Sequence, residues 1–224
     1  MIVMRPSKLA SILWAAALAL VVLSGSIAVP ILFRPFYYIQ IDALELPQRT
    51  GWSHETIREA YDQVLDFCVL DRPFGTGELA WSEAGRSHFA DVQKLFWVDF
   101  AVLGGALAVA GVLLVLRRRG KLVFWRPLGR GAGFWAGVLA AGLVLVTGAL
   151  AAMDFDRAFM VFHALFFPGK DNWIFDPAVD QIILVMPEVF FRNCAILIGA
   201  VLLAGCGALI LWDVLHTRRS EPHT

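Results

Sequence analysis

The chain is poor in charged residues, which make up 17% of its 224 residues and cancel to a formal net charge of zero. Without an excess of positive charge, nothing in the composition indicates binding to nucleic acid. Hydrophobic residues instead reach 58%, and the mean hydropathy is +0.67, well above the values of an ordinary soluble domain. The chain is therefore predicted to be a single domain whose main solvent is the lipid bilayer.

Cysteine is also scarce, and its spacing excludes the common cysteine-based sites. The three cysteines contain no CxxC pair, and Cys194 and Cys206 lie within an apolar run. Only Cys68 can lie outside the bilayer, so no internal disulfide is expected. The sequence also contains no HExxH motif, no internal repeat and no low-complexity tract.

Four apolar runs are long enough to cross about 30 Å of hydrocarbon at about 1.5 Å per helical residue. They cover residues 9–33, 95–116, 133–152 and 190–212. The first run follows Arg5 and Lys8 and so resembles a signal peptide, but it continues to Phe33, which favours an uncleaved anchor. The predicted fold class is all-α: a polytopic membrane protein with four transmembrane helices and helical extracytoplasmic loops that cap one face.

The positions of lysine and arginine predict the orientation of these spans. The short connection between the second and third runs carries Arg117, Arg118, Arg119, Lys121, Arg126 and Arg130. Further basic residues flank both termini, so both termini are expected in the cytoplasm. The loops of about 34–94 and 153–189, which hold nearly all of the acidic residues, would then lie on the extracytoplasmic side.

Both outer loops show helical patterns. Ser53 is suited to cap a helix in which residues 57, 61, 64, 65 and 68 recur at helical spacing, and this helix is expected to lie against the membrane or its neighbours. Ser82 or Ser87 is expected to cap a helix that runs into the second span. In the second loop, Asp176 with Pro177 predicts another short helix, and Pro187 marks the start of the fourth span.

Two histidines border predicted spans on the same outer side of the membrane. His163 is surrounded by five phenylalanines, and a lone imidazole in apolar surroundings needs a partner. His88 precedes the second span and, taken alone, could equally be a solvated interfacial residue. Asp91 lies one helical turn after His88, where it could orient the imidazole or be an ordinary surface carboxylate.

Four further residues are candidates for supporting or substrate-binding roles. Asp99 lies inside the second span and Arg192 near the outer end of the fourth, where ionisable groups are costly and often functional. An ion pair between them, or a contact of Arg192 with a lipid polar group, is one interpretation; an interfacial Asp99 and a snorkelling Arg192 are the other. Tyr37 and Trp173 are outer-loop aromatics of the kind that form an interfacial belt.

Two sequence blocks resemble the bacterial lipoprotein intramolecular transacylase family. The first is His88-Phe89-Ala90-Asp91-Val92-Gln93-Lys94-Leu95-Phe96. The second, more specific block contains Phe162-His163-Ala164-Leu165-Phe166-Phe167, Trp173, Phe175-Asp176-Pro177, Asp180, Pro187-Glu188 and Phe190-Phe191. The order of four spans and the long first outer loop agree with that family over essentially the whole chain.

The resemblance implies an enzyme of the bacterial cytoplasmic membrane that acts on diacylglyceryl-modified lipoproteins. It would move the sn-2 acyl chain from the glycerol oxygen to the α-amino group of the lipidated cysteine, without a cofactor, with His88 and His163 as the catalytic residues. The chemistry suits two imidazoles. An α-amine with a pKa of about 7.7–8.0 must lose a proton to attack an ester, and the glycerol oxygen must gain one.

Two other classes stay open on the sequence alone. A metal-dependent membrane hydrolase could use His88, His163 and an outer carboxylate such as Asp91 as ligands, although no tight ligand pair is present. A non-enzymatic four-span interaction protein could use its outer loops as a binding surface, although that interpretation gives no role to two histidines at one face.

Overall fold

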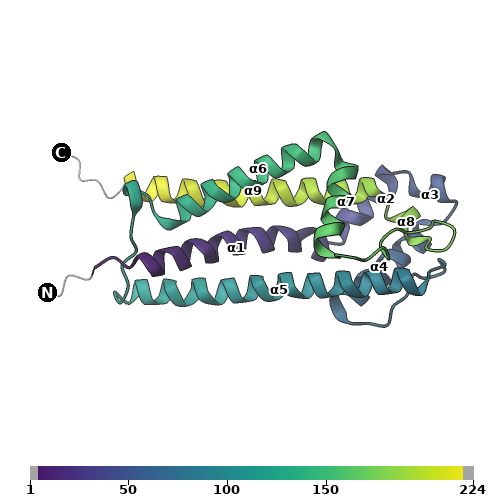
Figure 1. The fold of residues 1–224 in the computed structure, drawn as a ribbon, viewed down its shortest axis with the longest axis horizontal. Coiled ribbons are helices and arrows are strands. Elements are labelled where there is room, and N and C mark those ends of the chain that lie inside the picture. Colours follow the sequence, from purple (N-terminus) through teal and green to yellow (C-terminus); the bar gives the residue numbers. More distant parts are fainter. Residues whose placement is uncertain (1–4, 219–224) are drawn as a thin grey trace. The chain divides into compact units, whose positions relative to one another are not determined.

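The computed structural model describes residues 5–218, and helices form most of this part of the chain. In chain order the elements are α1 (Lys8–Leu32), α2 (Pro35–Ala43), α3 (Leu46–Thr50), α4 (His54–Leu70), α5 (Glu83–Arg118), the 3-10 turn η1 (Pro127–Gly129), α6 (Ala132–Met153), α7 (Phe155–Phe166), α8 (Ile182–Val185) and α9 (Glu188–Arg218) (Figure 1). Among the described residues, four helices are long and apolar enough to cross a membrane: α1, α5, α6 and α9. The predicted all-α membrane fold is confirmed.

The chain divides into two compact units. The first contains Met1–Ile27, Phe100–Ala149 and Ile198–Thr224, and the second contains Ala28–Asp99 and Leu150–Leu197. Most of each apolar run belongs to the first unit, whereas both outer loops and both candidate histidines belong to the second. The helices α1, α5, α6 and α9 each contribute residues to both units. The organisation as one membrane domain stays a prediction.

In the first unit, small residues let the apolar helices approach closely. A Cβ atom at Gly137 of α6 would lie 2.8 Å from the backbone oxygen of Cys206 in α9. A Cβ atom at Gly205 of α9 would lie 2.9 Å from the Val22 side chain of α1. Helices in a bilayer gain little from the hydrophobic effect between them, so they associate through close packing of this kind.

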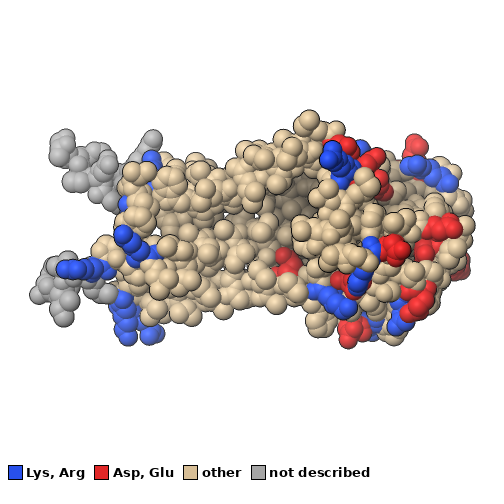
Figure 2. All heavy atoms as spheres, viewed as in Figure 1, with Lys and Arg blue, Asp and Glu red and all other residues tan. Residues whose placement is uncertain are grey.

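Basic residues of the first unit gather at one end of its helices. Figure 2 shows lysine and arginine at the end where α5 connects to α6, and the face of these helices seen in this view carries almost no charge. The connection is tied to the start of α1, because the Ser7 amide donates to the Val123 carbonyl at 2.9 Å and the Trp125 amide donates to the Ser11 hydroxyl at 2.7 Å. Apolar helices with basic residues at one end are typical of a helix bundle in lipid.

In the second unit, α4 supplies the centre of the packing. Its N-cap is Ser53, as predicted, because the Ser53 hydroxyl accepts from the Thr56 amide at 3.1 Å. The predicted apolar face is buried, with Ile57 fully inaccessible and Tyr61 4% exposed. The ring of Tyr61 stacks on that of Tyr37 at 3.8 Å between centroids. Of the two expectations for this helix, packing against its neighbours is the one that the structure bears out.

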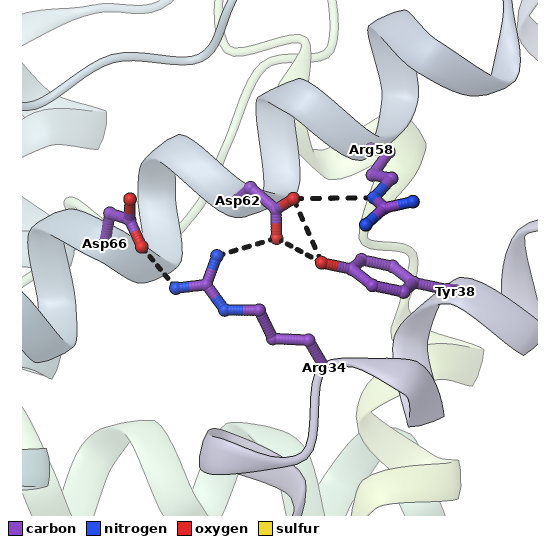
Figure 3. Close-up of polar contacts among 5 residues, drawn as sticks. All are labelled: Arg34, Tyr38, Arg58, Asp62 and Asp66. Carbon is purple, nitrogen blue, oxygen red and sulfur yellow. Dashed lines mark hydrogen bonds and ion pairs between the residues drawn. The ribbon is translucent and has the colours of Figure 1, made fainter.

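A charged cluster joins the start of α2 to α4 (Figure 3). The Arg34 guanidinium donates to Asp62 at 2.9 Å and also pairs with Asp66, one turn further along α4. The Tyr38 hydroxyl donates to the same Asp62 at 2.8 Å, and Arg58 lies over the Tyr38 ring at 4.0 Å. Two arginines and two aspartates cancel in charge, so the cluster links the two helices without leaving an unpaired ion.

The start of α5 is held by the second outer loop. The Ser82 hydroxyl accepts from the Gly85 amide at 3.0 Å, so Ser82 is the cap, one of the two serines predicted. The buried Asp180 carboxylate in turn accepts from the Ser82 amide and from its hydroxyl, both at 2.8 Å. The negative charge of Asp180 at a helix N-terminus is favourable, and it fixes the direction in which α5 begins.

Gly85 leaves room for this carboxylate, which gives a first prediction. A Cβ atom at Gly85 would overlap Oδ1 of Asp180, so Gly85→Ala should lower the thermal midpoint by an amount that reflects roughly 1–3 kcal/mol of overpacking. The matched control is Gly104→Ala in the same helix, where a Cβ atom would meet nothing within 4 Å. Thermal unfolding in detergent checks both, and equal midpoints for the two variants would contradict the prediction.

One predicted element is wrong. Asp176 and Pro177 start a turn and not a helix: the Asp176 carboxylate accepts from the Ala178 amide at 2.9 Å, and the short helix α8 begins only at Ile182. The Gln181 amide donates to the Ala80 carbonyl at 3.0 Å. This contact with the first outer loop competes with helix formation at Asp176. The predicted start of the fourth span is confirmed, since α9 begins directly after Pro187.

Candidate active site

His163 lies on the one stripe of α7 that faces the protein interior. Its side chain is buried, and its Nδ1 lies 2.8 Å from the carbonyl oxygen of Phe159, one turn earlier. Because a carbonyl can only accept, Nδ1 carries the proton of the neutral ring, and Nε2 has the free lone pair. Burial lowers the pKa of His163, and the bond to the Phe159 carbonyl offsets part of that effect. At neutral pH the ring is therefore uncharged, with Nε2 able to take up a proton.

His88 lies in the second turn of α5 and is also buried. Its Nδ1 is inaccessible and has no hydrogen-bond partner among the described residues. A buried polar atom without a partner costs about 1–3 kcal/mol, and such atoms in native structures often mark functional positions.

The two imidazoles lie close together, although 75 residues separate them in the sequence. Their ring centroids are 5.8 Å apart, and the ring planes are inclined by 32°. The expectation that these histidines meet at one site is confirmed by this distance. Two rings this close can serve the same pair of reacting groups, directly or through one water molecule.

Aromatic rings enclose the histidine pair. Phe167 lies 5.0 Å from the ring of His88 and 5.6 Å from that of His163. Phe175 contacts His88 at 5.5 Å, and Phe159 contacts His163 at 4.3 Å. Most of the phenylalanines that the sequence places around His163 do line it. An apolar enclosure strengthens the electrostatic interactions of any polar group inside it.

Trp173 forms one wall of the site. Its ring stacks on His163 with 4.3 Å between centroids and an angle of 26°, and its Nε1 donates to the Lys170 carbonyl at 3.1 Å. Trp173 was expected in an interfacial aromatic belt, and the structure gives it a more specific position against a candidate catalytic ring. Its supporting role stays a prediction.

Asp91 makes contacts other than the expected one with His88. Its buried carboxylate accepts from Lys170 at 2.5 Å, from Lys94 at 3.2 Å and from the Asn172 amide at 3.4 Å. Within residues 5–218 no hydrogen bond joins Asp91 to His88, although the Asp91 charge acts on the His88 ring. A role of Asp91 in orienting that imidazole stays a prediction. Asp91 instead connects α5 to the segment that carries Trp173.

Three of the candidates remain: Tyr37, Arg192 and Asp99. Tyr37 is 1% exposed and donates to the Val185 carbonyl at 2.7 Å, so it is a core residue and not part of a lipid-facing belt. Arg192 is exposed on α9, and Asp99 is half-buried on α5. Their supporting roles, and an ion pair between them, stay predictions.

Lys170 and Asn172 were missed by the sequence reasoning. Both lie in the irregular segment between α7 and α8, where side-chain contacts with α5 have no periodic pattern to reveal them. The only available signal was their position just before Trp173 in the more specific sequence block. Asn172 also lies 3.4 Å from the Ser87 hydroxyl, beside His88.

A metal site and a surface depression were two other possible locations for the chemistry. Within residues 5–218 no group of three His, Cys, Asp or Glu side chains is arranged to hold a metal ion. An open surface depression of about 450 Å³ lies at the junction of α4 and α5, lined by Asp71, Gln93, Lys94, Trp97 and Val98. Neither histidine lines it.

Known protein structures share this architecture. The chain is similar to the membrane-integral lipoprotein intramolecular transacylase Lit from Bacillus cereus, with 24% identity and a TM-score of 0.79 over 95% of this chain and 97% of that one. Two structures of the same protein with one histidine substituted each give a TM-score of 0.77 at 24% identity, over 95% of this chain and 94% or 95% of theirs. At this identity the likeness shows the fold. No curated protein matches the chain.

The family assignment rests on a separate match that covers most of the sequence. The model of the lipoprotein intramolecular transacylase family, Lit, matches residues 12–191. This range includes both histidines, the segment between α7 and α8, most of α1, and all of α5 and α6. The two sequence blocks that suggested this family lie entirely within the match. The chain therefore belongs to the lipoprotein intramolecular transacylase family and is an acyltransferase of the membrane.

Proposed function

We propose that this chain moves the sn-2 acyl chain of a diacylglyceryl-cysteine to the α-amino group of that cysteine, with His88 and His163 as the catalytic pair. The observation that carries the proposal is the approach of the two buried imidazoles to 5.8 Å within an aromatic enclosure. In the reaction, the amine nitrogen forms a bond to the ester carbonyl carbon, and the bond between that carbon and the glycerol oxygen breaks. One proton passes from the nitrogen to the glycerol oxygen, so no cofactor is needed.

His163 is the proposed base. Its Nδ1 is committed to the Phe159 carbonyl, which leaves the Nε2 lone pair for the proton that the attacking amine must lose. Because burial lowers the pKa of His163, the ring is in the accepting form at neutral pH. His163 would then return the same proton to the departing glycerol oxygen.

His88 is the proposed hydrogen-bond donor to the ester carbonyl oxygen. Negative charge develops on that oxygen when the amine attacks, and a donor held in an apolar enclosure stabilises such charge more than it would in water. Because His88 lies beside His163, one substrate ester can contact both rings. Donor and acceptor groups belong to one lipid anchor, so the enzyme's main task is to position them.

The outer surface of α7 favours access from the lipid. Its large apolar side chains are exposed, with Val161 58% and Leu165 70% accessible, and only the stripe that holds His163 and Phe159 turns inward. α7 begins two residues after the apolar helix α6 ends, so it would lie near the depth of the lipid headgroups. A diacylglyceryl anchor remains in one leaflet and would reach the histidines sideways past this helix.

We place both termini in the cytoplasm and the histidine pair on the extracytoplasmic side of a bacterial cytoplasmic membrane. The basic connection between α5 and α6 supports this orientation, since basic residues near the ends of spans concentrate on the cytoplasmic side. Diacylglyceryl-modified lipoproteins and membrane lipid are the proposed partners.

The orientation gives a second prediction. Reporter fusions after residues 60 and 172 should read outside, and fusions after residues 122 and 224 should read inside. The enzyme activity of a periplasmic reporter and the fluorescence of a cytoplasmic one measure this for each fusion. A cytoplasmic reading at residue 60 would remove the outer site as proposed here.

The proposed reaction is tested by mass spectrometry of a lipoprotein N-terminal peptide from cells with and without this protein. With the protein, the peptide should carry one amide-linked acyl chain and one ester-linked acyl chain. Without it, both chains should be ester-linked and the amine free. A peptide that keeps two ester-linked chains in both strains would contradict the proposal.

A further inference from the structure

We propose that Lys170 and Asp91 form a latch that holds residues 167–175 against α5 and so positions Trp173 on His163. In this inference, which rests on the proposed catalytic role of the histidine pair, neither latch residue acts on substrate. Both are positioning residues that act through the wall of the site.

The Asp91 carboxylate is the fixed half of the latch. Its side chain is only 10% exposed, and a buried carboxylate is stable only when it is paired and hydrogen-bonded. Lys94 reaches it from the same helix and therefore joins nothing new. Lys170 and Asn172 reach it from the segment between α7 and α8, so these two contacts connect that segment to α5.

Lys170 links this anchor to the active-site wall. Its ammonium contacts Asp91 at 2.5 Å, and its own carbonyl accepts from Trp173 Nε1 at 3.1 Å. One residue thus holds α5 with its side chain and Trp173 with its backbone. The Trp173 ring then lies flat on His163, and two phenylalanines at the ends of the same segment, Phe167 and Phe175, contact His88.

Release of the segment would expose His163 to water. The groups that face this ring are His88 from α5, the carbonyl and ring of Phe159 and the ring of Phe162 within α7, and Trp173 and Phe167 from the latched segment. From α9, the Phe191 ring contacts that of Phe159 at 5.7 Å. The charged groups nearest to the pair, Asp91 and Lys170, neutralise each other while the latch is closed.

Because burial lowers the pKa of His163, an open latch should raise that pKa towards its ordinary value. The neutral, proton-accepting ring would then be lost at a higher pH. The acidic limb of the pH–rate profile should move upward, and activity at the optimum should fall because the ring is no longer held in place.

The experiment compares Lys170→Met with Lys170→Arg and with the control Lys94→Met. Each full-length enzyme is assayed in lipid vesicles with a synthetic diacylglyceryl lipopeptide across a pH series. Lys170→Met should lose on the order of 10²-fold in kcat, the size expected when a catalytic group shifts by about 1 Å, and its acidic limb should move upward. Lys170→Arg should recover most of the activity, and Lys94→Met, which also loses a contact with Asp91, should match the parent enzyme.

A double variant, Asp91→Asn with Lys170→Met, separates exposure from charge. It opens the latch without leaving an unpaired carboxylate near the histidines, so its acidic limb should still move upward. A limb that returns to the parent position would show that charge and not position was responsible, which would overturn the latch. Trp173→Leu provides a further check, since it removes the wall, leaves the ion pair in place and should also move the limb.

His163→Ala in the same series distinguishes failure of the latch from failure of the proposed function. If His163→Ala keeps its activity, the catalytic assignment fails and the latch with it. If His163→Ala is inactive while Lys170→Met has the parent kcat and pH profile, only the latch is wrong. A loss of kcat in Lys170→Met that Lys94→Met reproduces would also overturn it.

Discussion

The His163→Ala enzyme is expected to accumulate in the membrane and to leave the lipoprotein amine unacylated. The substitution removes the ring that is proposed to accept the proton. Its Nδ1 bonds to the Phe159 carbonyl, which leaves Nε2 as the proton acceptor. Loss of a general base typically costs on the order of 10²–10⁴-fold in rate. Mass spectrometry of the lipopeptide product, with immunoblotting for the amount of enzyme, measures both quantities.

His216 offers a control with the same local geometry. Its Nδ1 contacts the carbonyl of Trp212, one turn earlier in α9, at 2.8 Å, and its ring stacks on a tryptophan at 4.0 Å. It belongs to the first unit, whereas His163 belongs to the second. His216→Ala should therefore have normal activity. Normal product from His163→Ala would end the catalytic assignment, whatever the family membership indicates.

The second large effect is expected for His88→Ala, alone and combined with His163→Ala. His88→Ala should also abolish the acyl shift, because the ester oxygen loses its donor. If the two rings act on one substrate as a unit, the double variant should be hardly slower than either single variant, since the groups of a catalytic unit are strongly non-additive. Residual single-turnover rates of the three purified variants measure this.

Additive losses would point to a different arrangement. If the logarithms of the two single effects sum to that of the double variant, the histidines contribute independently, for example one in binding and one in chemistry. The distance of 5.8 Å between the rings would then reflect shared packing and not joint action on one ester.

The long elements of the fold were predictable because their signals are local. Apolar runs of about 20 residues, and caps such as Ser53 and Ser82, act within a few residues of the position they define. The sequence predicts a helix at Asp176, and this prediction is wrong because the competing contact comes from Ala80, almost a hundred residues away. No local pattern reports such a contact.

The candidate site was predictable in part for the same reason. His88 and His163 could be paired because topology places both at one end of their spans, and each is a residue type with suitable chemistry. The partner of Asp91 could not be predicted. Helical spacing favours a contact with His88, yet a half-exposed lysine from an irregular loop takes the carboxylate.

Burial could not be deduced for Tyr37 from the sequence. An aromatic residue just after a span is typical of a membrane interface, and this one is instead inside the second unit, stacked on Tyr61. Tyr37 is buried because α4, a later helix, packs over it. Tertiary packing of this kind overrides the interfacial preference of a single residue.

The central claim is that one lipid anchor both gives and receives the acyl chain, and a crossover measurement tests it most directly. The enzyme in vesicles is given an equal mixture of two diacylglyceryl lipopeptides, one with deuterated acyl chains on a light peptide and one with ordinary chains on a ¹⁵N-labelled peptide. An intramolecular transfer at the histidine pair predicts that every light peptide keeps a deuterated amide-linked chain and every heavy peptide an ordinary one. Products with exchanged chains, or with a third acyl chain, would contradict the account.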